Sequence, residues 1–325
     1  MSGKWMKKLA LFTAVIMLVM ILPAASVSAA ATKDYVALGD SIGYGYTDPV
    51  NGGYADLYAE YLGDEYLYTN LCTPGDTTLD LQSVIHTNWA LLKRADIITV
   101  SIGSNNLLGP SIAALAGLYG LDAAAFQDPD GADLMTALAL AIQADRADGG
   151  VTPEQRLSLL TDMSKPEAQK LNTSLAAGTL LFTLQWPTIM TQLHLLAPNA
   201  KIYVNNLYNP LLSSKISSAS MEPLYKLLNI YMQTINLQIS RYTSRYNYQM
   251  IDVYKLFADP AMYANLAADP LSAPVSFNIP AALAIAGSSY NPDDPNQFAL
   301  FFFACDPHPT TVGHMLIFEK LKLLH

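Results

Sequence analysis

Residues 35–42 read YVALGDSI, and residues 97–104 read IITVSIGS. Each stretch begins with a short, mostly apolar run, and glycine and serine follow it closely. Runs of this kind are typical of strands that are buried on both faces of a parallel sheet. In open α/β sheets, ligands bind at the edge where such strands end. The polar residues after these runs therefore indicate both a fold class and the position of a site.

Further strands and helices are expected to alternate along the chain. Strand-like runs lie at residues 66–71, 201–205 and 249–253. Helical spacing of apolar residues occurs at residues 53–62, 78–92, 221–246 and 311–324. This alternation predicts an α/β fold with helices on both faces of the sheet. Because the crossovers are right-handed, the carboxyl ends of the strands should lie along one edge.

One region departs from this alternation. Residues 107–200 separate the third and fourth strands, and this connection is several times longer than an ordinary crossover. Helical patterns within it cover residues 134–144, 153–163 and 166–196. We expect a helical insertion over the carboxyl edge of the sheet. Together with the Pro-, Ala- and Asn-rich stretch 259–296, it is interpreted as walls or a lid above the site, with simple packing as the alternative.

The N-terminal segment has the pattern of a secretory signal peptide. Three lysines precede an apolar run over residues 9–22, and small residues follow over residues 24–31. The apolar run is shorter than the roughly 20 residues that a membrane-spanning helix needs, which disfavours an anchor. We therefore expect residues 1–30 to be removed by cleavage near Ala29 to Ala31, so that the mature chain is secreted and extracellular.

The composition indicates an acidic protein with a large core. The formal net charge is −9, and loss of the three N-terminal lysines would take it to −12. Hydrophobic residues make up 51% of the chain and charged residues only 14%. Proteins that bind nucleic acid usually carry a basic patch, and the composition offers none. We expect no nucleic-acid partner.

Ser41 follows the first strand directly, as the last residue of a Gly-Asp-Ser tripeptide. By itself this tripeptide is typical of an ordinary turn at a strand end. Three further segments each offer a group that acyl transfer needs. Gly75 could present a main-chain N–H to an anion, the segment 103–106 an amide side chain, and His308 a general base. A nucleophile, oxyanion donors and a base would then meet at one edge of the sheet.

These four segments, in this order, resemble the SGNH, or GDSL-type, lipase and esterase family. Residues 95–108 are similar to a bacterial secreted subgroup of it. The resemblance implies a three-layer αβα sandwich around a flavodoxin-like parallel sheet of five strands. It assigns residues 31–325 to one hydrolase domain, which would include the helical insertion at about residues 107–200.

The resemblance also implies roles for the site residues. Ser41 would be the nucleophile and His308 its general base, oriented by Asp306. The main-chain N–H groups of Ser41 and Gly75 and the side-chain amide of Asn105 would form the oxyanion hole. Such a site needs no cofactor.

The sequence departs from the family pattern at three places. Pro307 alone separates Asp306 from His308, where the family commonly has two residues, and some members of the family dispense with the acid. Asn106 stands where the family commonly has Asp, and Ile42 where it has Leu. The nucleophile, the base and the oxyanion donors are all present.

The remaining histidines have simpler interpretations. We expect His314, on the last helix, to pack or cap. His86 and His194 lie in helical runs without acidic partners at ligand spacing, and His325 is the last residue of the sequence. No group of cysteine, histidine and acidic residues has metal-ligand spacing, so we expect no metal.

The chain has two cysteines, Cys72 and Cys305, and both are expected near the active edge. A disulfide between them would be compatible with a secreted protein. We favour two buried free thiols, and a Cα separation beyond about 7 Å would exclude the bridge.

Three functions are compatible with these residues. The first is hydrolysis of small-molecule or lipid esters, with transient contact with lipid interfaces; the apolar composition of residues 134–196 favours it. The second is carbohydrate O-deacetylation, because Tyr44, Tyr46 and Tyr54 could stack on sugars. The third, a lipid-binding protein without activity, is disfavoured because the complete set of catalytic groups is present.

Overall fold

The computed structural model describes residues 33–46, 52–125, 132–147, 152–287, 291, 294, 297 and 304–325. The predicted signal peptide, residues 1–30, lies outside the described residues, as does part of the irregular stretch 259–296.

The centre of the fold is a sheet of five parallel strands in the order β2-β1-β3-β4-β5. The strands are β1 (Lys33–Gly39), β2 (Tyr66–Asn70), β3 (Ala95–Ser101), β4 (Lys201–Asn205) and β5 (Tyr248–Ile251). This order is the flavodoxin-like one, in which ligands bind where the strand order reverses, between β1 and β3. The predicted fold class and all five predicted strands are confirmed.

Alternation of side chains along the strands builds a separate core on each face of the sheet. In β1, Val36 and Leu38 belong to one buried cluster, whereas Tyr35 and Ala37 belong to the other. Successive residues of a strand point to opposite faces, so a continuous apolar run fills both cores. All four of these side chains are fully buried.

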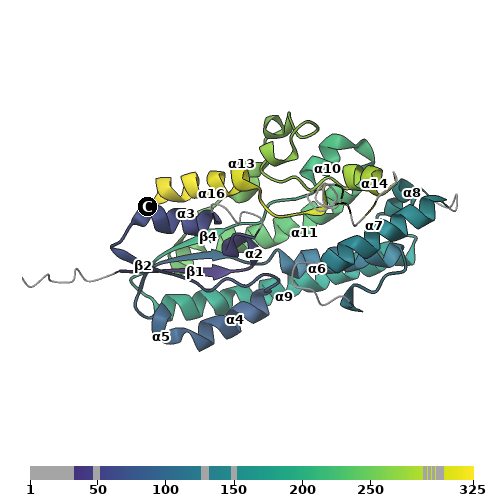
Figure 1. The fold of residues 1–325 in the computed structure, drawn as a ribbon. Coiled ribbons are helices and arrows are strands. Elements are labelled where there is room, and N and C mark those ends of the chain that lie inside the picture. The colour runs from purple at the N-terminus through teal and green to yellow at the C-terminus, as the bar shows by residue number, and fades with distance from the viewer. Residues whose placement is uncertain are drawn as a thin grey trace, which may run out of the picture. The chain divides into compact units, whose positions relative to one another are not determined.

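Helices cover both faces and complete the three layers (Figure 1). On the Tyr35 face lie α3 (Tyr54–Leu62), α13 (Val253–Phe257) and α16 (Thr311–Leu324). On the Val36 face lie α4 (Thr78–Thr87), α5 (Trp89–Leu92), α9 (Pro166–Leu196), α11 (Glu222–Arg241) and α12 (Thr243–Tyr246). The predicted helix 78–92 is interrupted in the structure. Asn88 is both the C-cap of α4 and the N-cap of α5.

The long connection between β3 and β4 is helical, as expected. It contains α6 (Asn105–Leu118), η1 (Ala123–Ala125), α7 (Ala132–Ala147), α8 (Pro153–Ser158) and α9. In the second half of α9, Trp186, Ile189 and Leu193 are fully buried in the core of the Val36 face. The last helix of the predicted range 107–200 thus also covers the Val36 face of the sheet, and the bounds of the insertion stay a prediction. The predicted helix 153–163 ends at residue 158.

The long helix α9 also reaches the start of α6. A side chain at Gly178 would meet the main-chain oxygen of Asn106 at 1.8 Å, so only glycine allows the two helices this close. The insertion is thereby held against the loop that follows β3.

The second irregular stretch is partly helical. It contains η3 (Pro260–Tyr263), η4 (Pro270–Ser272) and α14 (Ile279–Gly287), and α14 contacts α7 of the insertion. Before it, α10 (Leu212–Ser217) and η2 (Ala219–Met221) follow β4. Within the part of the chain described, no helix combines the length and apolarity required to cross a membrane. The lid interpretation of these segments stays a prediction.

Candidate active site

Ser41 lies at the point where β1 turns into the short helix α2 (Ser41–Tyr44). The turn depends on Gly39, whose φ is +142° and whose position leaves no room for a side chain. A Cβ there would lie 1.9 Å from the main-chain oxygen of Ser101 in β3. The glycine of the Gly-Asp-Ser tripeptide therefore lets the chain turn beside β3 and directs Ser41 to the carboxyl edge of the sheet.

Asp40, the middle residue of the tripeptide, joins the loops after β1 and β3. Its buried carboxylate accepts hydrogen bonds from the Ile42 main-chain N–H at 3.0 Å and from the Ser104 hydroxyl at 2.8 Å. Burial raises the pKa of Asp40 to about 6, although these hydrogen bonds favour the ionised form. The sequence interpretation gave Asp40 and Ser104 no role, but an Asp directly before a short helix is a recognisable N-cap.

His308 bridges the serine and an acid. Its Nε2 lies 2.8 Å from Ser41 Oγ, and its Nδ1 lies 2.6 Å from Asp306 Oδ1. The Asp306 side chain is 6% exposed and that of His308 16%, so solvent competes little for either contact. The structure brings the three residues together in one chain of hydrogen bonds.

The unusual spacing of the acid is accommodated by a tight turn. The same Asp306 oxygen accepts the main-chain N–H of His308 at 2.9 Å, as in an Asx turn. The main-chain oxygen of Pro307, at the tip, accepts the Tyr208 hydroxyl at 2.7 Å. Tyr208 was not singled out from the sequence, although it lies three residues after the fourth strand, at the edge where the site forms.

Asn105 and Gly75 belong to two loops that are hydrogen-bonded to each other. Asn105 begins α6, and its Nδ2 donates to the main-chain oxygen of Asp76 at 2.9 Å. An amide nitrogen carries two hydrogens, so one remains for another acceptor. Gly75 lies in the exposed turn before α4 with a φ of +89°. Asn105 lines the cavity beside Ser41, whereas Gly75 is not among the residues that line it.

Asn106 departs from the family pattern, and its hydrogen bonds explain why an amide fits this position. Its Oδ1 accepts from the Thr78 main-chain N–H at 3.3 Å, and its Nδ2 donates to the Thr78 hydroxyl at 3.1 Å. An Asp could accept but, when ionised, could not donate. The amide therefore fastens the start of α6 to the start of α4, beside the loop that carries Gly75.

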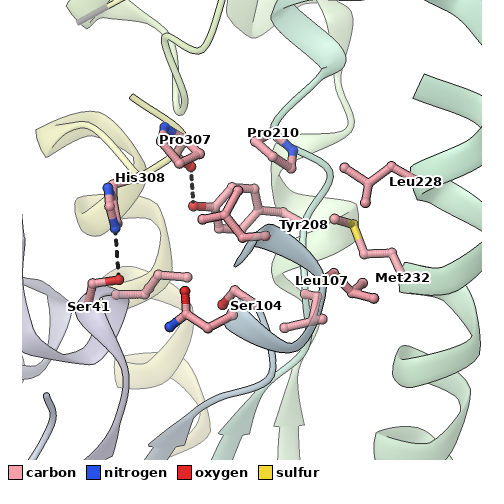
Figure 2. Close-up of a pocket in the computed structure, with 13 residues that line it drawn as sticks. Ser41, Ser104, Leu107, Tyr208, Pro210, Leu228, Met232, Pro307 and His308 are labelled. Carbon is pink, nitrogen blue, oxygen red and sulfur yellow. Dashed lines mark hydrogen bonds between the residues drawn. The ribbon is translucent and has the colours of Figure 1, made fainter. Parts of the chain in front are cut away.

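The cavity at Ser41 has polar groups at one end and apolar walls elsewhere. The empty space at this site, including the part that opens to solvent, is about 500 Å³. Figure 2 shows Ser41 and His308 at one end and Leu228 and Met232 of α11 at the other. A hydroxyl becomes an effective nucleophile when a neighbouring imidazole accepts its proton, and a buried carboxylate stabilises the imidazolium that forms. The arrangement can perform that chemistry.

The model of the GDSL-like lipase/acylhydrolase family matches residues 37–315 of this chain. The chain belongs to this family. Among solved structures, it is similar to an extracellular lipase from Streptomyces rimosus, with 15% identity and a TM-score of 0.51 over 90% of this chain and 100% of that one. A lipase from a goat rumen metagenome gives 15% identity and a TM-score of 0.50 over 90% and 97%. A search of curated proteins finds no match.

The three tyrosines that were expected to stack on sugars differ in their exposure to solvent and in their neighbours. Tyr54 is fully buried, so its part of that interpretation is wrong: burial against α16 leaves no ring face for a ligand. Tyr44 is 53% exposed. The Tyr46 ring lies 4.8 Å from that of His308, centroid to centroid, and is tilted against the imidazole by 50°.

Two of the other histidines, His314 and His325, have hydrogen-bond partners within the fold. His314 is fully buried on α16, where its Nδ1 accepts from the Tyr54 main-chain N–H at 3.3 Å, which confirms the packing interpretation. His325 Nδ1 lies 2.6 Å from the Tyr58 hydroxyl. His86 and His194 are exposed on α4 and α9. Within the described residues, no cluster of His, Cys, Asp and Glu side chains could hold a metal ion.

The two cysteines are both free thiols, as the favoured interpretation expected, although only Cys72 is fully buried and Cys305 is half-buried. The alternative, a disulfide between their loops, is not formed. Cys72 lies directly behind α2, because a Cβ added at Gly43 would meet its sulfur at 2.6 Å. Burial raises the pKa of both thiols, which keeps them protonated and unreactive at neutral pH.

Proposed function

We propose that this protein is a secreted serine hydrolase that cleaves carboxylic esters through an acyl-enzyme on Ser41. The observation that carries the proposal is the contact of 2.8 Å between His308 Nε2 and Ser41 Oγ, with Asp306 at 2.6 Å from His308 Nδ1. Membership of the GDSL-like lipase/acylhydrolase family supports the same reaction class.

The reaction follows from these contacts. Ser41 Oγ attacks the ester carbonyl carbon while His308 Nε2 accepts the hydroxyl proton. His308 then returns this proton to the leaving alkoxide as the carbon–oxygen bond breaks. Water, deprotonated by His308, attacks the acyl-enzyme and releases the acid and Ser41. Asp306 keeps the imidazole oriented and stabilises its protonated form.

Charge that develops on the carbonyl oxygen needs hydrogen-bond donors. We assign the main-chain N–H groups of Ser41 and Gly75 and the Nδ2 amide of Asn105 to this role. Each such donor contributes roughly 3 kcal/mol to the transition state. The hydrogen bond from Asn105 to the Asp76 carbonyl supports this grouping, because it fixes the amide beside the loop that carries Gly75.

The substrate class is proposed to be lipid or small-molecule esters. The walls of the cavity at Ser41 are mostly apolar, with Leu107, Leu228 and Met232 among them. Apolar walls gain free energy from burying hydrocarbon. We also propose that the enzyme contacts lipid interfaces transiently and belongs to the bacterial secreted subgroup, with residues 1–30 as signal peptide and residues 31–325 as the hydrolase domain. An exported protein whose N-terminus lies near Ala29 to Ala31 would support this processing.

The test of the function is hydrolysis of p-nitrophenyl acetate and butyrate by the wild type, Ser41→Ala and the control Ser220→Ala. Ser220 is exposed and distant in sequence from the site, so its loss should leave activity unchanged. We expect Ser41→Ala to lose at least about 10³-fold in kcat. Hydrolysis that persisted in Ser41→Ala would contradict the assignment of Ser41 as the nucleophile. Release of acetate from acetylated xylan, with little activity on longer acyl esters, would favour the carbohydrate deacetylase instead.

A further inference from the structure

The helices on the Val36 face of the sheet carry apolar side chains that point away from the sheet. Six residues of α4, α9 and α11 are each more than half exposed: Leu79, Leu180, Leu184, Leu195, Ile230 and Leu237. Each lies two positions along its helix from a buried residue: Leu81, Phe182, Trp186, Leu193, Met232 and Ile239. Two positions turn a helix by about 200°, so the exposed side chains lie on the side opposite the core.

These six side chains belong to adjoining helices. The middle helix, α9, contacts both α4 and α11, and Figure 1 shows α4 and α9 side by side on one face of the sheet. We call the surface that carries the six side chains the outer helical face. Single exposed apolar residues are ordinary, whereas several on adjoining helices indicate a surface that binds a partner or a membrane.

The charges on these helices differ in sign from those of the chain as a whole. The chain has a formal net charge of −9, but residues 78–94, 166–196 and 222–246 contain six basic and three acidic residues. Two of the basic residues are in ion pairs, Arg94 with Asp34 and Lys226 with Glu222. The outer helical face is therefore flanked by positive charge in an otherwise acidic protein.

Two exposed basic residues lie on the same side as the leucines. Arg241 follows Leu237 by four residues in α11, and Lys170 precedes Leu184 by about four helical turns in α9. No charged residue occurs between Lys170 and Lys201, so the outward side of α9 is uncharged beyond its second turn. The leucines and the basic residues thus form an apolar stripe with positive charge at its ends.

The outer helical face reaches the edge of the sheet where Ser41 lies. Gly178 of α9 lies against the main chain of Asn106, and the side chain of Gln185 is hydrogen-bonded to the hydroxyl of Thr78. Leu180 and Leu184 lie between these two contacts along α9. A surface that covered these leucines would therefore come close to the loops that precede α4 and α6.

We propose that the outer helical face docks on the surface of a membrane that contains anionic lipids. The leucine and isoleucine side chains enter the boundary between headgroups and acyl chains, and Lys170 and Arg241 bind the lipid phosphates. The inference rests on the transient lipid contact proposed above and names the surface that makes it. Acidic residues of the opposite helical layer lie beyond the sheet, and salt screens their repulsion over about 8 Å.

The charges favour a membrane over a second copy of the chain. A symmetric dimer built on this face would bring the same patch of both copies together. The basic residues that flank it would then face each other, whereas an anionic lipid surface attracts them.

The test measures binding to lipid vesicles without turnover. The Ser41→Ala protein is sedimented with vesicles of phosphatidylcholine alone and of phosphatidylcholine mixed with phosphatidylglycerol. We expect binding to the mixed vesicles, which weakens as salt is added. In this background, Leu180→Gln with Leu184→Gln should lower the partition coefficient at least tenfold, because two leucine side chains no longer enter the lipid.

The matched control for the leucines lies on the other helical layer. Met315 and Leu323 are exposed on α16, so Met315→Gln with Leu323→Gln should leave binding within about twofold. Thermal unfolding shows that each variant is folded before its binding is compared. Equal losses in the two double variants would overturn the assignment of the face.

The basic residues are tested by a second pair of variants. Lys170→Gln with Arg241→Gln should weaken binding to the mixed vesicles at least tenfold, since each cation near an anionic surface contributes about fivefold. Binding to phosphatidylcholine alone should not change. Lys255→Gln with Lys320→Gln, on α13 and α16, removes the same charge from the opposite layer and should have little effect.

Other outcomes separate this inference from the proposed function. If the Ser41→Ala protein does not bind the mixed vesicles, the docking inference alone is overturned. The same holds if the lipid-free protein is a dimer that Leu180→Gln with Leu184→Gln converts to a monomer, because the face would then join two copies. Hydrolysis of p-nitrophenyl acetate needs no membrane, so its absence in the protein with Ser41 intact would contradict the proposed function and not the docking.

Discussion

The carboxylate of Asp306 contacts His308 twice, at the ring Nδ1 at 2.6 Å and at the main-chain N–H at 2.9 Å. A spacing with a single intervening residue therefore still places the acid at the imidazole. The main-chain contact fixes the turn, and the turn fixes the direction of the ring. Asp306 and His308 are thereby linked, and Nε2 of the ring faces Ser41 Oγ.

The substitution Asp306→Asn should keep the contact with the main-chain N–H of His308 and change the contact with its ring. The amide oxygen can still accept the main-chain N–H, so the turn should form, but an uncharged partner no longer stabilises the imidazolium. We expect kcat to fall by roughly 10³–10⁴-fold with KM nearly unchanged. Asp259→Asn is the control, because Asp259 forms the same kind of turn with the Ala261 N–H on the surface. Steady-state kinetics on p-nitrophenyl butyrate check this, and less than a threefold loss for Asp306→Asn would show that the acid is dispensable.

Tyr208→Phe tests a positioning residue. The substitution removes the hydroxyl that holds the Pro307 carbonyl at 2.7 Å and leaves a buried oxygen without that donor. We expect a loss of about 1–2 kcal/mol of stability and a fall of roughly tenfold in kcat at constant KM.

Tyr231→Phe is the matched control for Tyr208. Its hydroxyl bonds Asn172 of α9, away from Ser41, so it should lose stability but not kcat. Equal effects of the two substitutions on kcat would mean that Tyr208 supports the fold and not the position of the base.

Gly39→Ala tests the turn that carries the nucleophile. The new methyl group would lie 1.9 Å from the Ser101 carbonyl oxygen, and φ is +142°. Strain and overpacking together should lower the free energy of unfolding by roughly 3–5 kcal/mol. Gly120→Ala, where φ is +71° and no atom lies within 4 Å, should cost only about 1 kcal/mol. Urea denaturation measures both, and similar losses would contradict the close approach of β1 and β3.

Asp40 should make the stability depend on pH. Its pKa is about 6 in the folded protein and near 3.8 in the unfolded chain, so the folded state binds the proton more tightly. The stabilisation is complete below about pH 4 and is lost as the pH rises through 6, by about 3 kcal/mol in all.

Asp40→Asn removes this titration. As the pH rises from 4 to 7, the wild type should therefore lose unfolding free energy that the variant keeps. Asp76, whose pKa burial also raises to about 6, titrates in both proteins, and its charge adds to the rise of the Asp40 pKa. Denaturation curves recorded at several pH values measure this difference, and a constant difference would show that Asp40 does not hold its proton more tightly when folded.

The local sequence pattern was sufficient to predict the sheet and most of the site residues. The β-branched run before Gly103 is typical of a buried strand, and polar residues that follow parallel strands meet at one edge of the sheet. Ser41 and Asn105 could therefore be grouped from sequence, whereas His308, which precedes the last helix, was added as the base that acyl transfer needs and by the family resemblance. The contact of Asp306 with His308 also depends on neighbouring residues alone, but the family spacing pointed away from it.

Long-range packing was not predictable. Apolar residues occur along the whole of α9, so the sequence did not show which of them, such as Trp186, would be fully buried in the core of the Val36 face. Tyr208 and Pro307 are 99 residues apart, and their contact depends on how two loops meet. Tyr54 carried no mark of burial, because tyrosine is common both in cores and on surfaces.

The most direct test of the central claim is mass spectrometry of the enzyme after rapid acid quenching with p-nitrophenyl butyrate. We predict one added butyryl group, on the peptide that contains Ser41, in the wild type and none in Ser41→Ala. A butyryl group on any other residue, or turnover without an acyl-enzyme at Ser41, would contradict the account.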